Sequence, residues 1–114
     1  MRMYGYVRQP IPANKRDLIY KIMVHQTGRE GVYVYLYTSR EALFCSFDHH
    51  YPGLADALED WGEEVEEWIP LDDPLPGCQN DCPLPVRVKG WDTGQPRWGQ
   101  YEILEDGEWK QFQP

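Results

Sequence analysis

The chain has 114 residues, of which 41% are hydrophobic and 14% aromatic, and its formal net charge is −8. A chain of this length is about the usual size of one folded domain, so we expect a single domain spanning residues 1–114. Nucleic acids and anionic membranes are bound through Lys and Arg, so the negative charge argues against both as partners.

The first part of the chain is expected to form two strands around one helix. Residues 3–8, "MYGYVR", have the composition of a strand. The apolar residues of the segment 18–23 fall at helical spacing after a potential N-cap, Asn14, and predict a helix over residues 15–26. His25 would then be a favourable cation at the negative end of that helix. Residues 32–37, "VYVYLY", alternate strictly and predict a central strand covered on both faces, with its tyrosine hydroxyls reaching water or a partner.

The middle of the chain is expected to add a strand, a helix and a further strand. Residues 42–47, "ALFCSF", predict a strand that pairs with the strand of residues 32–37 in a hairpin. Apolar residues at helical spacing predict a short amphipathic helix over residues 52–61, with Pro52 in its first turn. The segment "EEVEEWIPL" could form a further helical turn or a strand, and we favour a strand at about residues 65–69 because Gly62 breaks the helical pattern.

The end of the chain carries a strong hairpin signal. The alternating "PVRVKG" predicts one strand, and the pair Asp106-Gly107 predicts a two-residue turn between two more. Counting outward from this turn pairs Leu104 with Trp109 and Tyr101 with Phe112. Tyr101, Ile103 and Phe112 would then be buried together on one face. The elements together predict an α+β fold, with a mostly antiparallel sheet of about five to seven strands and two helices.

The stretch from Asp72 to Pro85, "DDPLPGCQNDCPLP", sets two cysteines four positions apart. With residues upstream they could form a zinc site of thiolates and an imidazole, which are ligands that zinc prefers: Cys45, His49, Cys78 and Cys82. This spacing matches none of the common zinc signatures, and a Cys78–Cys82 disulfide would close only a short loop. A stiff proline-rich loop is the simpler interpretation, so we expect no metal and no cofactor, with a zinc-stabilised domain as the alternative.

The cysteine count and the length of the apolar runs bear on where the protein is located. Three cysteines are an odd number for a disulfide scaffold, and no apolar run has the length of a signal peptide or membrane span, so we expect a cytoplasmic protein.

The segment "FDHHYP" could supply an acid and a base for catalysis through Asp48 and His49. Neighbouring residues on an extended chain point in opposite directions, and no nucleophile motif accompanies them. We therefore expect no enzyme, and keep a small enzyme as a less favoured alternative.

Acidic residues are concentrated in the middle of the chain. Residues 41–86 hold twelve Asp and Glu with no Lys or Arg, whereas residues 1–40 hold seven Lys and Arg with two Asp and Glu. We interpret the dense part as a docking surface for a basic protein, with Trp61 and Trp68 as candidate anchors. A solvated face, partly neutralised by the basic first 40 residues, is the alternative. The predicted partner-binding residues are Asp56, Glu59, Asp60, Glu63, Glu64, Glu67, Asp72 and Asp73, with Glu66 beside them.

Two resemblances bear on function. The segment "DDPLPGCQNDCPLPVRVKGWDTGQPRWGQYEILEDGEWKQF" resembles the C-terminal signature of small uncharacterised bacterial domains, especially in "DDPLPGC" and "VRVKGWDTG". This implies a bacterial cytosolic protein and no particular activity. The chain as a whole, small, acidic and rich in Trp and Tyr, resembles the immunity proteins of bacterial toxin–immunity systems. That second resemblance implies a protein that binds and blocks a basic toxin domain.

Overall fold

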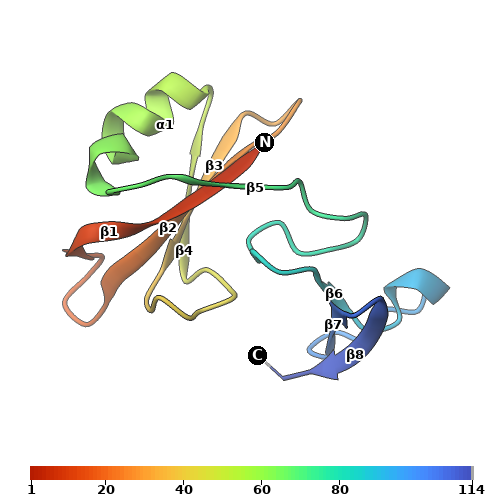
Figure 1. Ribbon diagram of the computed structural model, residues 1–114. Helices are drawn as coiled ribbons and strands as arrows, with labels where there is room; N and C mark the ends of the chain where they lie inside the picture. The colour runs from red at the N-terminus through yellow and green to blue at the C-terminus, as the bar shows by residue number, and fades with distance from the viewer. Residues whose placement is uncertain (114) are drawn as a thin grey trace. The chain divides into compact units, whose positions relative to one another are not determined.

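The computed structural model describes residues 1–113, and the chain divides into two compact units, Met1–Asp72 and Asp73–Pro114. The expectation of one domain over residues 1–114 stays a prediction, and each unit is described here by itself. Figure 1 shows the elements, which in chain order are β1 Arg2–Pro12, β2 Leu18–Gln26, β3 Val32–Tyr37, β4 Phe47–Tyr51, α1 Leu54–Trp61, η1 Gly62–Glu64, β5 Ile69–Leu71, β6 Val86–Val88, η2 Trp91–Thr93, β7 Tyr101–Glu105 and β8 Glu108–Phe112.

The predicted α+β fold with two helices is wrong. The described residues are mostly β, with eight strands in two antiparallel sheets and a single α-helix of eight residues. None of the helices in residues 1–113 has the length and apolar character needed to cross a lipid bilayer.

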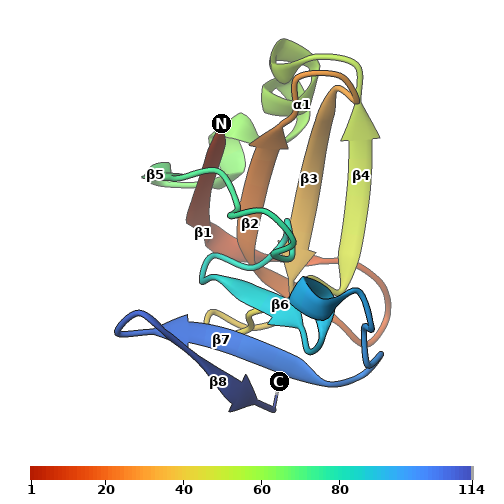
Figure 2. The same cartoon turned by 90° about the vertical axis from the view of Figure 1, so that its right-hand side faces the viewer.

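The first unit is a five-stranded antiparallel sheet with the order β4-β3-β2-β1-β5. Its strands lie side by side in Figure 2, and α1 lies against one face of the sheet. That face carries an aliphatic core with members such as Ile22, Val24 and Val34, which are fully buried. The other face carries a second cluster built on Met23, Tyr35 and Tyr37. We call these the aliphatic face and the tyrosine face.

Strand β3 confirms the prediction for residues 32–37, including the coverage of both faces. Val34 belongs to the aliphatic face and Tyr35 to the tyrosine face, as strict alternation requires. The hydroxyl of Tyr37 does not reach water, because this side chain is fully buried and its hydroxyl lies 3.8 Å from Sδ of Met23.

The predicted helix over residues 15–26 is wrong, because this segment is strand β2. The strand lies between β1 and β3 and is buried on both faces, so its apolar residues do not alternate with polar ones. Such a run cannot be told from a buried helix by periodicity. Oδ1 of Asn14 accepts hydrogen bonds from the backbone N–H groups of Arg16 and Asp17 at 2.8 Å, so Asn14 forms the turn before β2 and caps no helix. His25 lies within the strand, opposite Tyr33.

The middle elements are shifted from their predicted positions. Residues 42–46 are irregular and the strand that pairs with β3 is β4, so the antiparallel pairing was predicted but the strand was misplaced. Helix α1 confirms the helix predicted over residues 52–61, with a start at Leu54. The strand expected at residues 65–69 is found as β5, whereas Val65 makes an isolated bridge to Val7.

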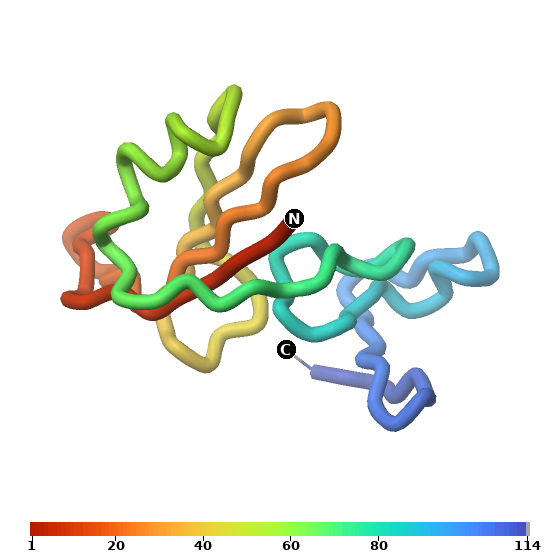
Figure 3. The backbone as a smooth tube through the Cα atoms, turned by 45° about the horizontal axis from the view of Figure 1, so that its top comes forward, coloured from red at the N-terminus to blue at the C-terminus, as the bar shows by residue number. Residues whose placement is uncertain are grey.

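The second unit is a three-stranded sheet with the order β6-β7-β8, and Figure 3 shows its chain closing as a hairpin between β7 and β8. The predicted register is confirmed, with Leu104 opposite Trp109 and Tyr101 opposite Phe112. The turn residues Asp106 and Gly107 both have positive φ, 52° and 79°, as a two-residue hairpin turn of this type requires. Of the three residues predicted to be buried together, Ile103 is buried, whereas Tyr101 and Phe112 are half-buried.

Charged side chains of the second unit are paired around Arg87. Its guanidinium lies 3.3 Å from the carboxylate of Glu102 and 3.6 Å from that of Asp92. The guanidinium also stacks 3.8 Å from the centre of the Trp109 ring. The side chains of Arg87 and Glu102 are only 12% and 18% exposed. We call these four residues the Arg87 cluster.

Candidate docking surface on the acidic helix

Helix α1 separates its apolar and acidic side chains onto opposite sides. Leu54, Ala57 and Trp61 pack against the aliphatic core, because they recur at the spacing of one helical stripe. The opposite stripe continues into η1 and is exposed throughout. It comprises Asp56, Glu59, Asp60, Glu63 and Glu64, which we call the acidic helix face.

The carboxylates of the acidic helix face are not paired with cations, although Nε of Arg8 donates to the backbone carbonyl of Glu63 at 3.1 Å. The segment 41–86 contains no Lys or Arg, so the helix cannot form ion pairs within itself. Within residues 1–113, no ion pair involves the carboxylates of Asp56, Glu59, Glu63 or Glu64. Like charges three and four positions apart on a helix repel by a few tenths of a kcal/mol per pair, about 0.2–0.5. The first unit therefore bears an electrostatic cost on this face.

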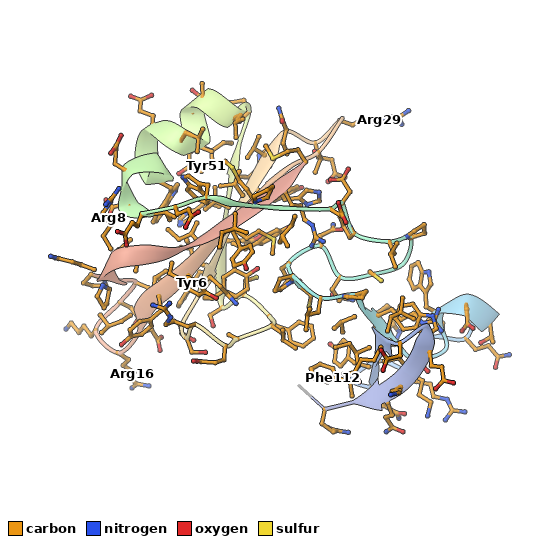
Figure 4. All side chains as sticks on the ribbon, viewed as in Figure 1. Tyr6, Arg8, Arg16, Arg29, Tyr51 and Phe112 are labelled. Carbon is orange, nitrogen blue, oxygen red and sulfur yellow. The ribbon has the colours of Figure 1, made fainter. Side chains whose placement is uncertain are left out.

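A short chain of hydrogen bonds holds the end of the helix to the sheet. The hydroxyl of Tyr51 donates to Oδ2 of Asp60 at 2.7 Å and accepts from Nε1 of Trp61 at 2.7 Å. Burial raises the pKa of Tyr51 above its ordinary value, and the bond to Asp60 raises it further. Figure 4 labels Tyr51, which lies beneath α1. This contact fixes Asp60 and Trp61, where the acidic helix face meets the aliphatic core.

The rest of the predicted acidic surface lies elsewhere. Glu66 and Glu67 line a hollow of about 290 Å³ together with Arg8 and Arg40, so these acids face cations of the first 40 residues. The guanidinium of Arg40 stacks 4.0 Å from the ring centre of Tyr6, which also lines this hollow. The basic first 40 residues, which the solvated-face alternative expects to neutralise part of the acidic charge, thus place two cations around this hollow, but no ion pair joins them to Glu66 or Glu67 within residues 1–113.

The last two predicted residues do not belong to the acidic helix face either. The carboxylate of Asp72 is exposed at the end of the first unit, and its carbonyl accepts a hydrogen bond from Nε of Arg2 at 2.8 Å. Asp73 begins the second unit. The structure thus brings together five of the eight predicted partner-binding residues, on α1 and η1.

The two tryptophans predicted as anchors are structural. Trp61 and Trp68 are both half-buried and pack against the aliphatic core. Nε1 of Trp68 donates to the carbonyl of Gly62 at 3.3 Å. Both tryptophans thus contribute to the packing of the first unit, and an anchoring role for them stays a prediction. Trp61 also lines a cavity of the first unit that no sequence pattern predicts, because residues from five separate segments form it.

The acid and base considered for catalysis point to different faces of the sheet. His49 lies opposite Val34 on the aliphatic face, and its ring lies 5.6 Å from that of Trp61. Asp48 lies opposite Tyr35 on the tyrosine face, where its charge contributes to raising the pKa of Tyr33 after the larger effects of the Glu30 hydrogen bond and of burial. The alternation expected of an extended segment is therefore present, and no hydrogen bond or ion pair joins the two side chains, although both residues line the cavity beside Trp61.

The residues considered for zinc come from both units. Cys45 and His49 belong to the first unit, and Cys78 and Cys82 to the second. Over the described part of the chain, no group of three or more His, Cys, Asp or Glu side chains is arranged to hold a metal ion. The structure offers no observation in favour of the zinc alternative.

No protein-family model matches the chain, and comparisons with curated proteins and with solved structures found no match either. The resemblances to small bacterial domains and to immunity proteins stay predictions.

Proposed function

We propose that the protein is a binding module that docks a basic protein partner on the acidic helix face. One observation carries the proposal: a stripe of exposed carboxylates on α1 and η1, with none of the Lys or Arg that usually intersperse acids on a solvated surface. A partner that brings Lys and Arg would relieve the repulsion within this stripe. The same charges would steer the partner during diffusional encounter and so raise the association rate.

The resemblance to immunity proteins supports a toxin domain as this partner. A stoichiometric inhibitor needs a complementary surface and no chemistry of its own, which agrees with the separation of Asp48 and His49 onto opposite faces. The odd number of cysteines supports a cytoplasmic location, where thiols stay reduced. In this proposal the protein is an inhibitor, not an enzyme.

The proposal can be tested by selection from a library of random peptides displayed on phage. The selection is run in parallel against the wild-type chain and against the variant Asp56→Asn, Glu59→Gln, Asp60→Asn, Glu63→Gln. We expect the wild type to enrich peptides rich in Lys and Arg, and the variant to lose this enrichment, because amides keep the shape of the face and remove its charge.

A matched control variant removes four carboxylates elsewhere: Glu41→Gln, Glu105→Gln, Asp106→Asn, Glu108→Gln. All four residues are exposed, and Asn is well tolerated at the positive φ of position 106. Both variants have a formal net charge of −8 + 4 = −4, so they differ only in where the charge is lost. The control should select the same basic peptides as the wild type. Equal loss in both variants, or peptides without an excess of Lys and Arg, would rule out a specific acidic docking face.

A further inference from the structure

The first unit contains a cavity of about 410 Å³ on the aliphatic face of its sheet, which the proposed function does not yet use. Its apolar lining includes Ile19 and Leu36, which are almost fully buried, and the more accessible Phe47 and Trp61. Its exposed lining residues include Ala13, Ser46, Asp48 and His49. Small-molecule clefts in proteins have volumes of about 300–1,000 Å³, so this cavity has room for a large side chain.

The cavity exists because the helix is too short to cover the sheet. Eight helical residues span about 12 Å, whereas the nine residues of β2 span about 30 Å. The chain runs across the aliphatic face only once as an α-helix within residues 1–113, and α1 ends at Trp61, one of the residues that line the cavity. The aliphatic face beyond that point is left for another group to cover.

The cavity and the acidic helix face meet at the C-terminal end of α1. Trp61 lines the cavity, and its neighbour Asp60 belongs to the acidic helix face. The hydroxyl of Tyr51 bonds both residues and fixes them relative to each other. A chain segment lying along the acidic helix face would therefore pass next to the cavity. Interfaces of this type have an apolar centre with a charged rim, and their strongest contacts are aromatic side chains inserted into such pockets.

We propose that this cavity receives an aromatic side chain of the basic partner, flanked in the partner's sequence by Lys or Arg. The rings of Trp61 and His49, 5.6 Å apart, line the cavity and would contact the inserted ring. The flanking cations would lie against the acidic helix face. This inference rests on the proposed function, and it adds the chemistry of the segment that the partner must present.

The test uses three synthetic peptides of five residues with blocked ends, titrated into the ¹⁵N-labelled chain and followed by NMR. The first has a tryptophan between two pairs of lysines, the second replaces that tryptophan with glycine, and the third keeps the tryptophan between two pairs of glycines. We expect the first to bind about tenfold more tightly than the second at low salt, as a centrally inserted aromatic side chain would give. Its titration should shift the Trp61 indole resonance and the amides of residues 13, 46 and 49.

Two variants fill the cavity from two separate segments that line it, Ala13→Trp and Ser46→Trp. Gln9→Trp serves as the matched control because Gln9 is exposed and does not line the cavity. Each blocked variant should bind both lysine peptides equally, whereas the control should keep the tenfold difference. Equal binding of both lysine peptides to the wild type, with shifts confined to α1 and η1, would overturn the cavity inference and leave the docking face intact. Equal binding of the first and third peptides would overturn the role of the acidic face in both proposals.

Discussion

The acidic helix face and the Arg87 cluster use charged residues in opposite ways. Around Arg87, two carboxylates and a tryptophan ring surround one guanidinium, and its side chain is only 12% exposed. On α1, several carboxylates are exposed and the helix contains no Lys or Arg. Charges that are paired and partly desolvated contribute to folding, whereas unpaired exposed charges contribute little to it or oppose it. The carboxylates of the acidic helix face, and not those of the Arg87 cluster, are therefore available to a partner.

The largest effect on folding is expected from removing strand β8, whose Trp109 ring stacks on the guanidinium of Arg87. A chain ending at Glu108 loses Trp109 and nearly all of β8, and leaves a two-stranded β6-β7 sheet, which is at best marginal in water. We expect the second unit to unfold, seen as loss of hydrogen-exchange protection at the amides of Lys89 and Leu104, which donate to the carbonyls of Gln100 and Pro85 across the β6-β7 sheet. A chain ending at Phe112 is the control and should keep this protection. Hydrogen-exchange protection that persists in the chain ending at Glu108 would show that β8 does not hold this unit together.

The next effect in size concerns the pairing itself. Arg87→Met keeps most of the side-chain volume but leaves Glu102 partly buried beside an apolar group. Hydrogen bonds to charged groups are worth about 1.5–3 kcal/mol. We expect the stability of the second unit to fall by an amount in that range, as measured by hydrogen exchange at the amides of β6 and β7. Arg97→Met removes an exposed guanidinium and should change stability by less than about 0.5 kcal/mol. Equal losses for the two variants would remove the contrast between paired and unpaired charge.

Removing the hydrogen bonds between Tyr51 and the end of α1 should have a smaller effect on the free energy of unfolding, and this effect should depend on pH. Tyr51→Phe removes the bonds to Asp60 and Trp61, for an expected loss of about 1–2 kcal/mol. Because the pKa of Tyr51 is raised above 10.0 in the folded chain, the folded state holds this proton more tightly than the unfolded state. The associated stability is fully present below about pH 10 and is lost as the pH rises through the raised pKa.

Denaturant unfolding of the wild type and of Tyr51→Phe, measured between neutral and alkaline pH, checks this sign. The difference in stability between the two should shrink as the tyrosine ionises. A difference that stays constant over that range would mean that Tyr51 titrates alike in the folded and unfolded chains.

The smallest effect on folding is expected for the acidic helix face. The variant Asp56→Asn, Glu59→Gln, Asp60→Asn, Glu63→Gln should change the free energy of unfolding by less than about 0.5 kcal/mol, or raise it. It relieves repulsion along the stripe, and the amide oxygen of Asn at position 60 can still accept the hydrogen bond from Tyr51. Thermal unfolding followed by circular dichroism measures this change. A loss of several kcal/mol would place these carboxylates among the structural charges, with the Arg87 cluster.

Local signals in the sequence predicted those elements whose structure is set locally. The turn Asp106-Gly107 determines the register of β7 and β8 because both residues take the positive φ that this turn needs. The alternation of β3 predicted its two covered faces. Strand β2 was missed because burial on both faces removes the alternation that identifies a strand, and its pairing with β1 and β3 is not visible in its own residues.

The candidate site was predictable to the same extent. The spacing of Asp56, Glu59, Asp60 and Glu63 placed them on one stripe of a helix, and the structure has them there. Charge density alone could not show that Glu67 shares a hollow with Arg8 and Arg40, since the three residues come from distant segments. The cavity lined by Trp61 was missed for the same reason, because it depends on where α1 ends relative to the strands beneath it.

The central claim, that the acidic helix face docks a basic partner, is tested most directly by association rates. A Lys- and Arg-rich peptide selected on the wild type is bound to the wild type and to the four-amide variant over a range of ionic strengths, in stopped-flow experiments. Electrostatic steering predicts an association rate constant about tenfold lower for the variant at low salt, with the two proteins converging as the Debye length shrinks to about 3 Å at 1 M. Equal rate constants for both proteins at every ionic strength would contradict the claim.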